Sequence, residues 1–289
     1  MIAVFLALLY CGQTSGVPTE PPKLLNDGAK ASFSNGILEL KGGAGWLRTA
    51  NPLLDFEVTF EIRALTADAN PGLILRSWTG RHNWPDRGYR LAIPSGGPVE
   101  DVSKILVGRR QKVDTVQKGS IELHPHGAWQ TIQVIGHGRS IRVAVNGTIA
   151  GEFVIESYGG YLMFENKKGR VELRQMTLRA SGPSDPLPAD VLRREELKAL
   201  EGRAPEVLHE VRPIYTYEAM RKMLRGLVLL EAVVLTDGSV GAVRVARSLD
   251  PDLDMSAAAA LKAWRFRPAI VNGAPVASIV EVEMEFVLR

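Results

Sequence analysis

The chain contains almost no cysteine: Cys11 is the only one among its 289 residues. A lone thiol cannot close an internal disulfide, so a cysteine-rich secreted scaffold is excluded, and so is a zinc site built on cysteines. A chain of this length does not need such staples, because two domains of ordinary size can each bury a core of their own.

An excess of charge of one sign is also missing. Residues 183–289 carry 14 Lys and Arg against 16 Asp and Glu, and residues 1–182 carry 21 against 16. The net charge of +3 is therefore spread along the chain. Neither half has the concentrated basic stripe of a nucleic-acid-binding protein, and no nucleic-acid partner is expected.

Residues 1–10 are apolar throughout but too few to span a bilayer, and their number fits the core of a signal peptide. We therefore interpret residues 1–16 as a signal or anchor segment and expect a location in the periplasm or outer envelope. Cys11 follows Leu8-Leu9-Tyr10, which resembles a lipoprotein processing site except that Tyr10 is not small. Lipid anchoring through Cys11, cleavage within residues 12–16 and retention as an anchor all stay open.

Between residues 31 and 179 the pattern is one of short strands separated by Gly, Pro and Asn turns. Strands are predicted at residues 38–40, 56–62, 73–77, 89–93, 104–109, 129–135, 141–145 and 171–179. Such a series indicates an antiparallel β-sandwich of the jelly-roll type over residues 24–181. Trp46 and Trp129 are predicted to lie in its core.

Three prolines, Pro183, Pro186 and Pro188, interrupt the β pattern and predict a domain boundary. A linker is expected over residues 182–212, with a short charged helix at 189–200.

The remaining residues, 213–289, predict a small α+β domain. Asp237-Gly238 and Asn272-Gly273 are strong hairpin signals, and Trp264 is predicted to belong to the core. Helices are expected at residues 217–225 and 255–263, and strands at 227–235, 240–245 and 276–288. In the last strand Val280, Val282, Met284, Phe286 and Leu288 share one face.

Several segments of the first domain resemble the 3-keto-disaccharide hydrolase family, a concanavalin-like sandwich. They are Phe56-Glu-Val-Thr-Phe-Glu-Ile62, Asn70-Pro-Gly-Leu-Ile-Leu-Arg76, Gly88-Tyr-Arg-Leu-Ala-Ile93, Trp129-Gln-Thr-Ile-Gln-Val134 and Gly160-Tyr-Leu-Met-Phe164. The resemblance implies an acidic residue straight after the tyrosine and a polar amide two positions later. Arg90 and Ala92 stand there instead, and a cation cannot serve as the acid or base of glycoside hydrolysis.

Saccharide binding needs only a stacking ring and a few oriented polar groups. Residues 78–89 supply both on a stretch punctuated by Gly and Pro, and Arg90 follows directly. The candidate saccharide-binding residues are Trp78, Arg81, His82, Trp84, Asp86, Arg87, Tyr89 and Arg90. The alternative is that Trp78 and Tyr89 belong to core strands, which leaves Trp84 exposed. Catalytic residues stay unknown, with Asp86, Glu100, Asp101 and Asp114 as the acids on plausible loops, and neither a metal nor a cofactor is expected.

The last domain resembles the TonB C-terminal domain family through Thr236-Asp-Gly-Ser-Val240, Trp264-Arg-Phe-Arg-Pro-Ala269 and Asn272-Gly-Ala-Pro-Val276. The resemblance implies that an envelope protein adds a strand to a sheet edge. The implied partner-binding residues are Val280, Glu281, Val282, Glu283, Met284, Glu285 and Phe286. A homodimer is the alternative, since exposed edges also pair with each other.

Three functions therefore compete. The favoured one is a carbohydrate-binding sandwich joined to a TonB-like interaction domain in an exported envelope protein. The alternatives are a hydrolase acting on 3-keto-disaccharides and a TonB-type energy transducer for outer-membrane transport.

Overall fold

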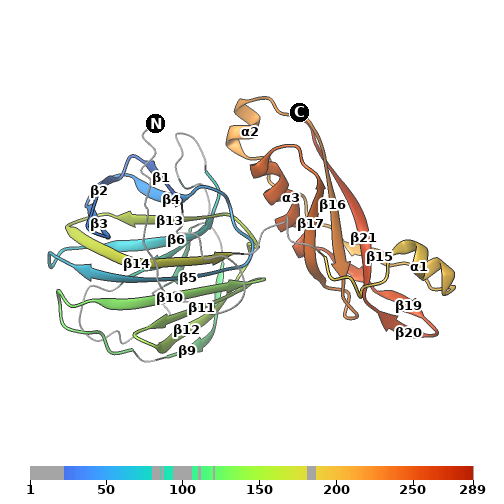
Figure 1. Cartoon of the computed structure of the whole chain (residues 1–289), viewed down its shortest axis with the longest axis horizontal. Helices are drawn as coiled ribbons and strands as arrows, with labels where there is room; N and C mark the ends of the chain where they lie inside the picture. The colour runs from blue at the N-terminus through green and yellow to red at the C-terminus, as the bar shows by residue number, and fades with distance from the viewer. Residues whose placement is uncertain are drawn as a thin grey trace. The chain divides into compact units, whose positions relative to one another are not determined.

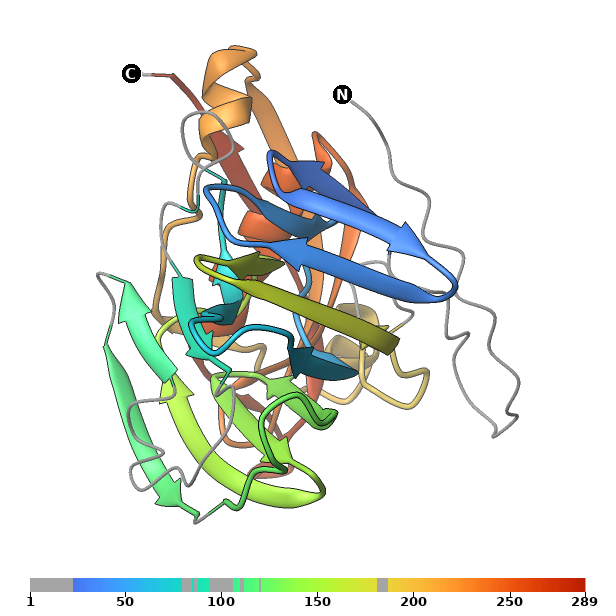
Figure 2. The same ribbon diagram turned by 90° about the vertical axis from the view of Figure 1, so that its left-hand side faces the viewer.

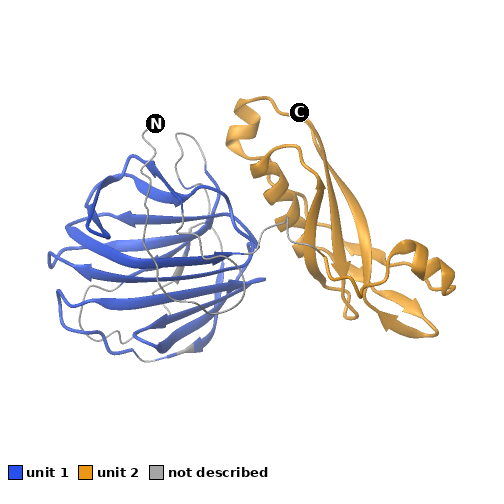
Figure 3. Ribbon diagram, viewed as in Figure 1, with its two compact units in different colours: residues 1–180 blue, residues 181–289 orange. Residues whose placement is uncertain are grey.

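The computed structural model describes residues 23–79, 85, 88–93, 106–109, 112–119, 121–180 and 187–288. The chain divides into two compact units, Met1–Ala180 and Ser181–Arg289 (Figure 3). Each unit has sheets and a core of its own.

The first unit is a sandwich of two antiparallel sheets (Figures 1 and 2). The six-stranded sheet has the order β1 (Leu24–Asp27), β4 (Trp46–Thr49), β13 (Tyr161–Asn166), β6 (Pro71–Ser77), β7 (Gly88–Ala92) and β8 (Leu106–Arg109). The eight-stranded sheet has the order β2 (Lys30–Ser34), β3 (Ile37–Lys41), β14 (Arg170–Ala180), β5 (Phe56–Ala64), β10 (Gln130–His137), β11 (Ser140–Val145), β12 (Thr148–Ile155) and β9 (Val113–Lys118).

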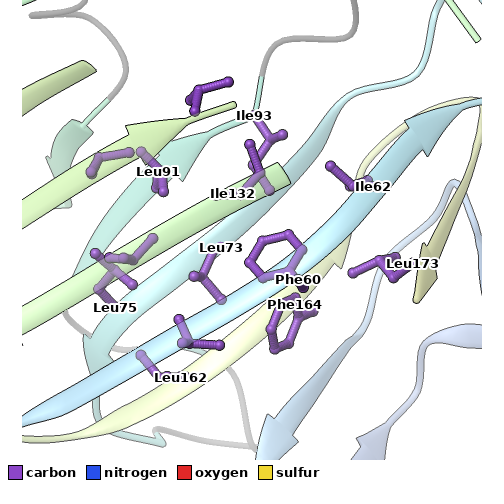
Figure 4. Close-up of a cluster of buried hydrophobic side chains, with 14 of the residues drawn as sticks. Phe60, Ile62, Leu73, Leu75, Leu91, Ile93, Ile132, Leu162, Phe164 and Leu173 are labelled. Atoms are coloured by element: carbon purple, nitrogen blue, oxygen red, sulfur yellow. The ribbon is translucent and has the colours of Figure 1, made fainter. Parts of the chain in front are cut away.

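The core of this unit lies between the two sheets because each strand alternates apolar and polar side chains. In β5 the buried positions are Phe56, Val58, Phe60, Ile62 and Ala64, every second residue. Figure 4 shows how side chains from both sheets meet, including Phe60 and Phe164, whose rings pack edge to face at 5.3 Å. The predicted antiparallel β-sandwich is confirmed.

The hairpin β11–β12 illustrates how sequence sets the register. Asn146 and Gly147 both have positive φ values, 50° and 81°, as the type I′ turn of a two-residue hairpin loop requires. The Asn146 side chain also accepts a hydrogen bond from the Thr131 amide at 2.9 Å, which ties the turn to β10.

Neither tryptophan that was predicted for this core lies between the sheets. Trp46 is buried, but with a second apolar cluster outside the main core. Trp129 is only half-buried, and the guanidinium groups of Arg63 and Arg174 lie over its ring, 4.7 and 4.1 Å from the ring centre. Those arginines belong to β5 and β14 and pair with Glu172 and Glu61, so Trp129 is part of a charged outer surface.

The second unit contains a three-stranded antiparallel sheet of order β17 (Val240–Arg247), β16 (Gly226–Val234) and β21 (Ser278–Phe286). Two smaller ladders join β15 (Glu206–His209) to β18 (Arg265–Arg267) and β19 (Ala269–Val271) to β20 (Ala274–Val276). The helices are α1 (Arg194–Ala199), α2 (Tyr217–Arg221) and α3 (Pro251–Ala263).

Helix α3 covers one face of this sheet (Figure 1). It begins four residues before the predicted start because the Asp250 side chain accepts from the Asp252 amide at 3.0 Å and Pro251 fits the first turn. Its alanines let the backbone approach β16 and β17 closely. Opposite them β16 contributes Val228, Leu230, Ala232 and Val234, all fully buried.

Residues 192–209 differ from the expected linker. Leu192 forms a bridge with Ser278, and the β15 residues Glu206–His209 pair with β18, so this stretch belongs to the second unit. The expected helix at 189–200 is limited to α1, because Leu197 is its only buried residue and Gly202 follows soon after.

Trp264 is confirmed as a core residue: it is 9% exposed, and its indole N–H donates to the Val211 carbonyl at 2.9 Å. Trp264→Ala is therefore expected to lower the free energy of unfolding of the second unit by about 3–5 kcal/mol. Met223→Ala is the control, because Met223 is 70% exposed and its loss is expected to cost less than about 0.5 kcal/mol. Denaturant unfolding of the full chain measures both, and equal midpoints would contradict the assignment.

Candidate functional site

The outer face of the six-stranded sheet, opposite the main core, gathers aromatic and charged side chains. The strand registers place Asp27, Trp46 and Glu165 side by side across β1, β4 and β13. The neighbouring row brings together Arg48, Met163, Ile74 and Arg90. Laterally paired residues point to the same face of a sheet, so these two rows form one surface. We call this surface the outer face.

At one side of the outer face an arginine lies on an aromatic ring. The Arg48 guanidinium is 4.7 Å from the centre of the Tyr161 ring, and Arg48 Nε donates to Asp27 Oδ2 at 2.6 Å. The Trp78 ring packs edge to face on Tyr161 at 6.4 Å. Trp46, Trp78 and Tyr161 are all buried, so in this structure they support the face and do not offer a free stacking platform.

At the other side of the outer face, the Arg90 side chain extends from β7 over Gly72 of the neighbouring strand β6. Arg90 Nε donates to Glu165 Oε1, and its Nη2 donates to Asn70 Oδ1 at 2.8 Å and to the Pro71 carbonyl at 3.2 Å. A Cβ atom at Gly72 would lie 2.9 Å from the guanidinium, so a side chain there would force the end of the Arg90 side chain to shift. The position where the family resemblance implies an acid therefore holds a fixed cation with a carboxylate partner.

A buried arginine ties together the loops at one end of the sandwich. Arg76 is 1% exposed and donates to the carbonyls of Leu54, Gly138 and Ser157. Desolvation lowers the pKa of its guanidinium to about 10, partly offset by the nearby Asp55 carboxylate. Its positive φ of 50° coincides with a shift in the β13–β6 register, which turns this side chain off the outer face.

Three of the eight candidate saccharide-binding residues lie within the described residues. Trp78 and Tyr89 are buried, and the Tyr89 hydroxyl accepts from the Glu156 amide at 2.9 Å. Arg90 is on the outer face beside Ile74. The other five, Arg81, His82, Trp84, Asp86 and Arg87, lie outside the described residues, as do Glu100 and Asp101.

Asp114, another acid weighed as catalytic, belongs to β9 in the other sheet and pairs with Lys112 at 3.1 Å. The sequence alone did not identify four residues that take part in the contacts of the outer face: Arg48, Asn70, Tyr161 and Glu165. Alternation in the segment that begins at Tyr161 could have placed Tyr161 and Glu165 on one face, but only the fold brings Arg48 and Asn70 to them.

Among the described residues no three His, Cys, Asp or Glu side chains are close enough to hold a metal ion. Within the same residues no helix is both long and apolar enough to cross a membrane.

In the second unit the candidate partner-binding residues form most of β21. Glu281, Glu283 and Glu285 are exposed, whereas Met284 and Phe286 are buried, as the predicted alternation requires. β21 pairs with β16 over its whole length and lies at the edge of the three-stranded sheet.

Together these features define a concanavalin-like β-sandwich protein with an appended α+β domain. The chain belongs to the family described as the 3-keto-alpha-glucoside-1,2-lyase-like domain, whose model matches residues 15–179. Residues 211–288 match the Gram-negative bacterial TonB protein C-terminal family. Both predicted resemblances are confirmed. No curated protein matches the chain.

Several solved structures are similar to part of the chain. A protein provisionally described as a glycosyl hydrolase from Parabacteroides distasonis ATCC 8503 is 14% identical, with a TM-score of 0.43, over 53% of this chain and 83% of that one. Carbohydrate-binding module CBM66 from Bacillus subtilis is 8% identical, with a TM-score of 0.39, over 54% and 95%. The β-glucanase of Bacillus licheniformis is 12% identical, with a TM-score of 0.36, over 53% and 82%. At these scores nothing about activity is carried over to this chain.

The Arg90–Glu165 pair is mostly shielded, with side chains 21% and 12% exposed. Arg90→Met is expected to lower the free energy of unfolding of the sandwich by about 1–3 kcal/mol, since it leaves a largely buried carboxylate without its main donor. In a double-mutant cycle Glu165→Gln should recover part of this loss. Arg142→Met is the control, because its pair with Glu152 is more exposed and is expected to contribute less than about 1 kcal/mol. Equal losses in Arg90→Met and Arg142→Met would contradict the shielding.

Burial raises the pKa of the Tyr89 phenol above its ordinary value of 10.0. A raised pKa means that the folded state holds this proton more tightly than the unfolded state, so the stability linked to Tyr89 falls as the pH rises above about 10. In an absorbance titration of the native protein, Tyr89→Phe should reduce the part of the tyrosinate absorbance that appears above pH 10. In denaturant the same substitution should remove signal near about pH 10. Loss of signal at the same pH in both states would contradict burial.

Proposed function

We propose that the chain is an exported envelope protein whose sandwich binds a saccharide without cleaving it and whose C-terminal domain holds an envelope protein. The proposal is supported by the joining, in one chain, of a 3-keto-alpha-glucoside-1,2-lyase-like domain and a TonB C-terminal domain. The second of these is typical of the Gram-negative envelope, which supports a periplasmic or outer-envelope location. Lipid anchoring through Cys11 stays a proposal.

The observation that favours binding over hydrolysis is the pairing of Arg90 with Glu165. Glycoside hydrolysis requires one carboxyl group as acid and a second as base or nucleophile. On the outer face the two described carboxylates, Asp27 and Glu165, each accept from an arginine. Such groups suit the orientation of sugar hydroxyls, since charged side chains form strong and directional hydrogen bonds.

Because Trp46, Trp78 and Tyr161 are buried, a stacking ring has to come from another residue. Trp84 is the proposed one, with Arg81, His82, Asp86, Arg87 and Arg90 as the polar residues of the site, whereas the candidates Trp78 and Tyr89 are buried and support the fold. A ring on the apolar face of a sugar, with a few polar groups around it, is a common arrangement in ligand sites.

A glycoside-processing enzyme is the second candidate, favoured by the family match over residues 15–179. In this alternative Asp27 and Glu165 are the described carboxylates on the outer face that could take part. An energy-transducing role of the C-terminal domain stays a prediction, as does a possible homodimer.

A glycan array followed by calorimetry on the full chain tests the proposal. Trp84→Ala is expected to weaken binding of the best glycan about threefold to tenfold, because a stacked ring is lost. Trp129→Ala is the matched control, since Trp129 lies on the outer side of the other sheet against Arg63 and Arg174. Equal effects of the two substitutions, or no glycan bound at all, would contradict the binding site.

Incubation of the same preparations with a 3-keto-α-glucoside separates the two candidates, and product release is the measurement. No turnover is expected. Turnover that disappears in Asp27→Asn or Glu165→Gln would establish the enzyme instead, provided that thermal melts show both variants to be folded.

A further inference from the structure

We propose that the partner of the second unit is a basic extended segment, with Lys or Arg at alternate positions, that adds as a strand to the outer edge of β21. This inference rests on the proposed protein contact of the C-terminal domain and specifies the chemistry of the partner. It is carried by the backbone direction of β21, by the regularity of its edge and by its three exposed glutamates.

The backbone direction follows from one hydrogen bond. The Ile279 amide donates to the Leu192 carbonyl at 2.8 Å, so Ile279 points its backbone groups away from β16. In an antiparallel ladder alternate residues point to the same side. Glu281, Glu283 and Glu285 therefore direct their amides and carbonyls to the outer edge, while Val280, Val282 and Met284 bond to β16. The bridge between Leu192 and Ser278 is parallel, so a segment of this chain already pairs with the start of the edge.

The regularity of the edge distinguishes β21 from β17, the strand at the other side of the sheet. The β16–β21 register runs without a shift from Gly226↔Phe286 to Val234↔Ser278. The β16–β17 register shifts twice, near Leu230 and Ala232. Irregular edges resist the addition of a further strand, whereas a regular edge accepts one. Beyond the Leu192 bridge β21 has no further ladder partner on this side among the described residues, and helix α1 is the element that also contacts β21 there.

The negative charge of the β21 edge determines which residues are expected in the strand that adds to it. Glu281, Glu283 and Glu285 are exposed, lie on one face, and form no ion pair with another described residue. Glu231, directly opposite Glu281 on β16, is by contrast paired with Arg244. Opposite charges on laterally neighbouring residues stabilise strand pairing, so Lys or Arg is expected beside each of these three glutamates.

The same glutamates argue against a second copy of this chain at the edge. Two β21 strands that pair antiparallel through their outer edges bring glutamates next to glutamates, and like charges in such positions destabilise pairing. Val280 and Val282, half-buried on the opposite face, favour apolar residues at the intervening positions of the partner. The expected partner pattern is therefore basic and apolar residues in alternation.

Binding of synthetic nine-residue peptides to the full chain tests the proposal. A peptide that alternates Lys and Val is expected to bind about tenfold more tightly than one that alternates Glu and Val, and the difference should shrink at high salt. Hydrogen exchange followed by NMR should show new protection of the amides of Glu281, Glu283 and Glu285. The amides of Val280, Val282 and Met284, already bonded to β16, should change little. A Lys/Val peptide with proline at its centre should lose the protection.

Charge reversal supplies the matched variants. Glu281→Lys, Glu283→Lys and Glu285→Lys combined should invert the preference toward the Glu/Val peptide. Glu195→Lys, Glu201→Lys and Glu210→Lys change the net charge of the unit equally, at exposed positions outside β21, and should leave the Lys/Val preference in place. An equal loss in both triple variants would overturn the proposal, because attraction would then depend on net charge alone.

The remaining outcomes separate this inference from the proposed function. Protection of Glu281, Glu283 and Glu285 by both peptides to the same degree would leave strand addition in place and overturn the basic partner. No protection by either peptide would overturn strand addition itself. Protection that rises with protein concentration and without peptide would make a second copy the occupant, which also overturns the inference.

Discussion

The sandwich depends on two strands that arrive last along the chain and pair in the middle of both sheets. β13 lies between β4 and β6, and β14 lies between β3 and β5. Until β13 is in place, β4 is not connected to β6 within the six-stranded sheet. Until β14 is in place, β3 is not connected to β5 within the eight-stranded sheet. Pairing over such sequence separations is slow because of its loop-closure entropy, so we expect the two central strands to limit when the core can form.

The same constraint assembles the outer face. β13 carries Tyr161, Met163 and Glu165. Arg48, from the neighbouring strand β4, lies against Tyr161 and Met163, and Arg90, from β7 beyond β6, donates to Glu165. Glu165 is thus placed beside a cation that is 75 residues away along the chain. Gly72 leaves the space in which that cation lies. The strand order therefore determines which charged side chains meet on the outer face. The partner of Arg90 is Glu165, and no pattern among neighbouring residues in the sequence could have indicated it.

Much of the fold follows from local rules in the sequence, and the exceptions have physical causes. The alternation in β21 and the turn at Asn272-Gly273 needed only neighbouring residues, and both are confirmed. Trp129 was assigned to the wrong environment because its position depends on Arg63 and Arg174, which come from other strands. The start of α3 was missed although Asp250-Pro251 is a local signal for it. The expected linker includes Leu192 and β15, whose pairing partners Ser278 and β18 lie about 60–90 residues later in the chain and could not be read from local composition.

Under the proposed function, the two units would recognise their partners by different physical means. The outer face of the sandwich presents side chains that are held by one another, so specificity for a saccharide there would depend on fixed positions of charged groups and rings. The edge of β21 presents backbone groups, which any extended segment can satisfy, and under the further inference its three glutamates would then select among segments by charge. Because the two modes use separate residues, a change in one site need not alter the other. Under the proposed function, a saccharide and a protein that belong to one envelope assembly would make the second binding event intramolecular, so the chain would hold that assembly more tightly than through either contact alone.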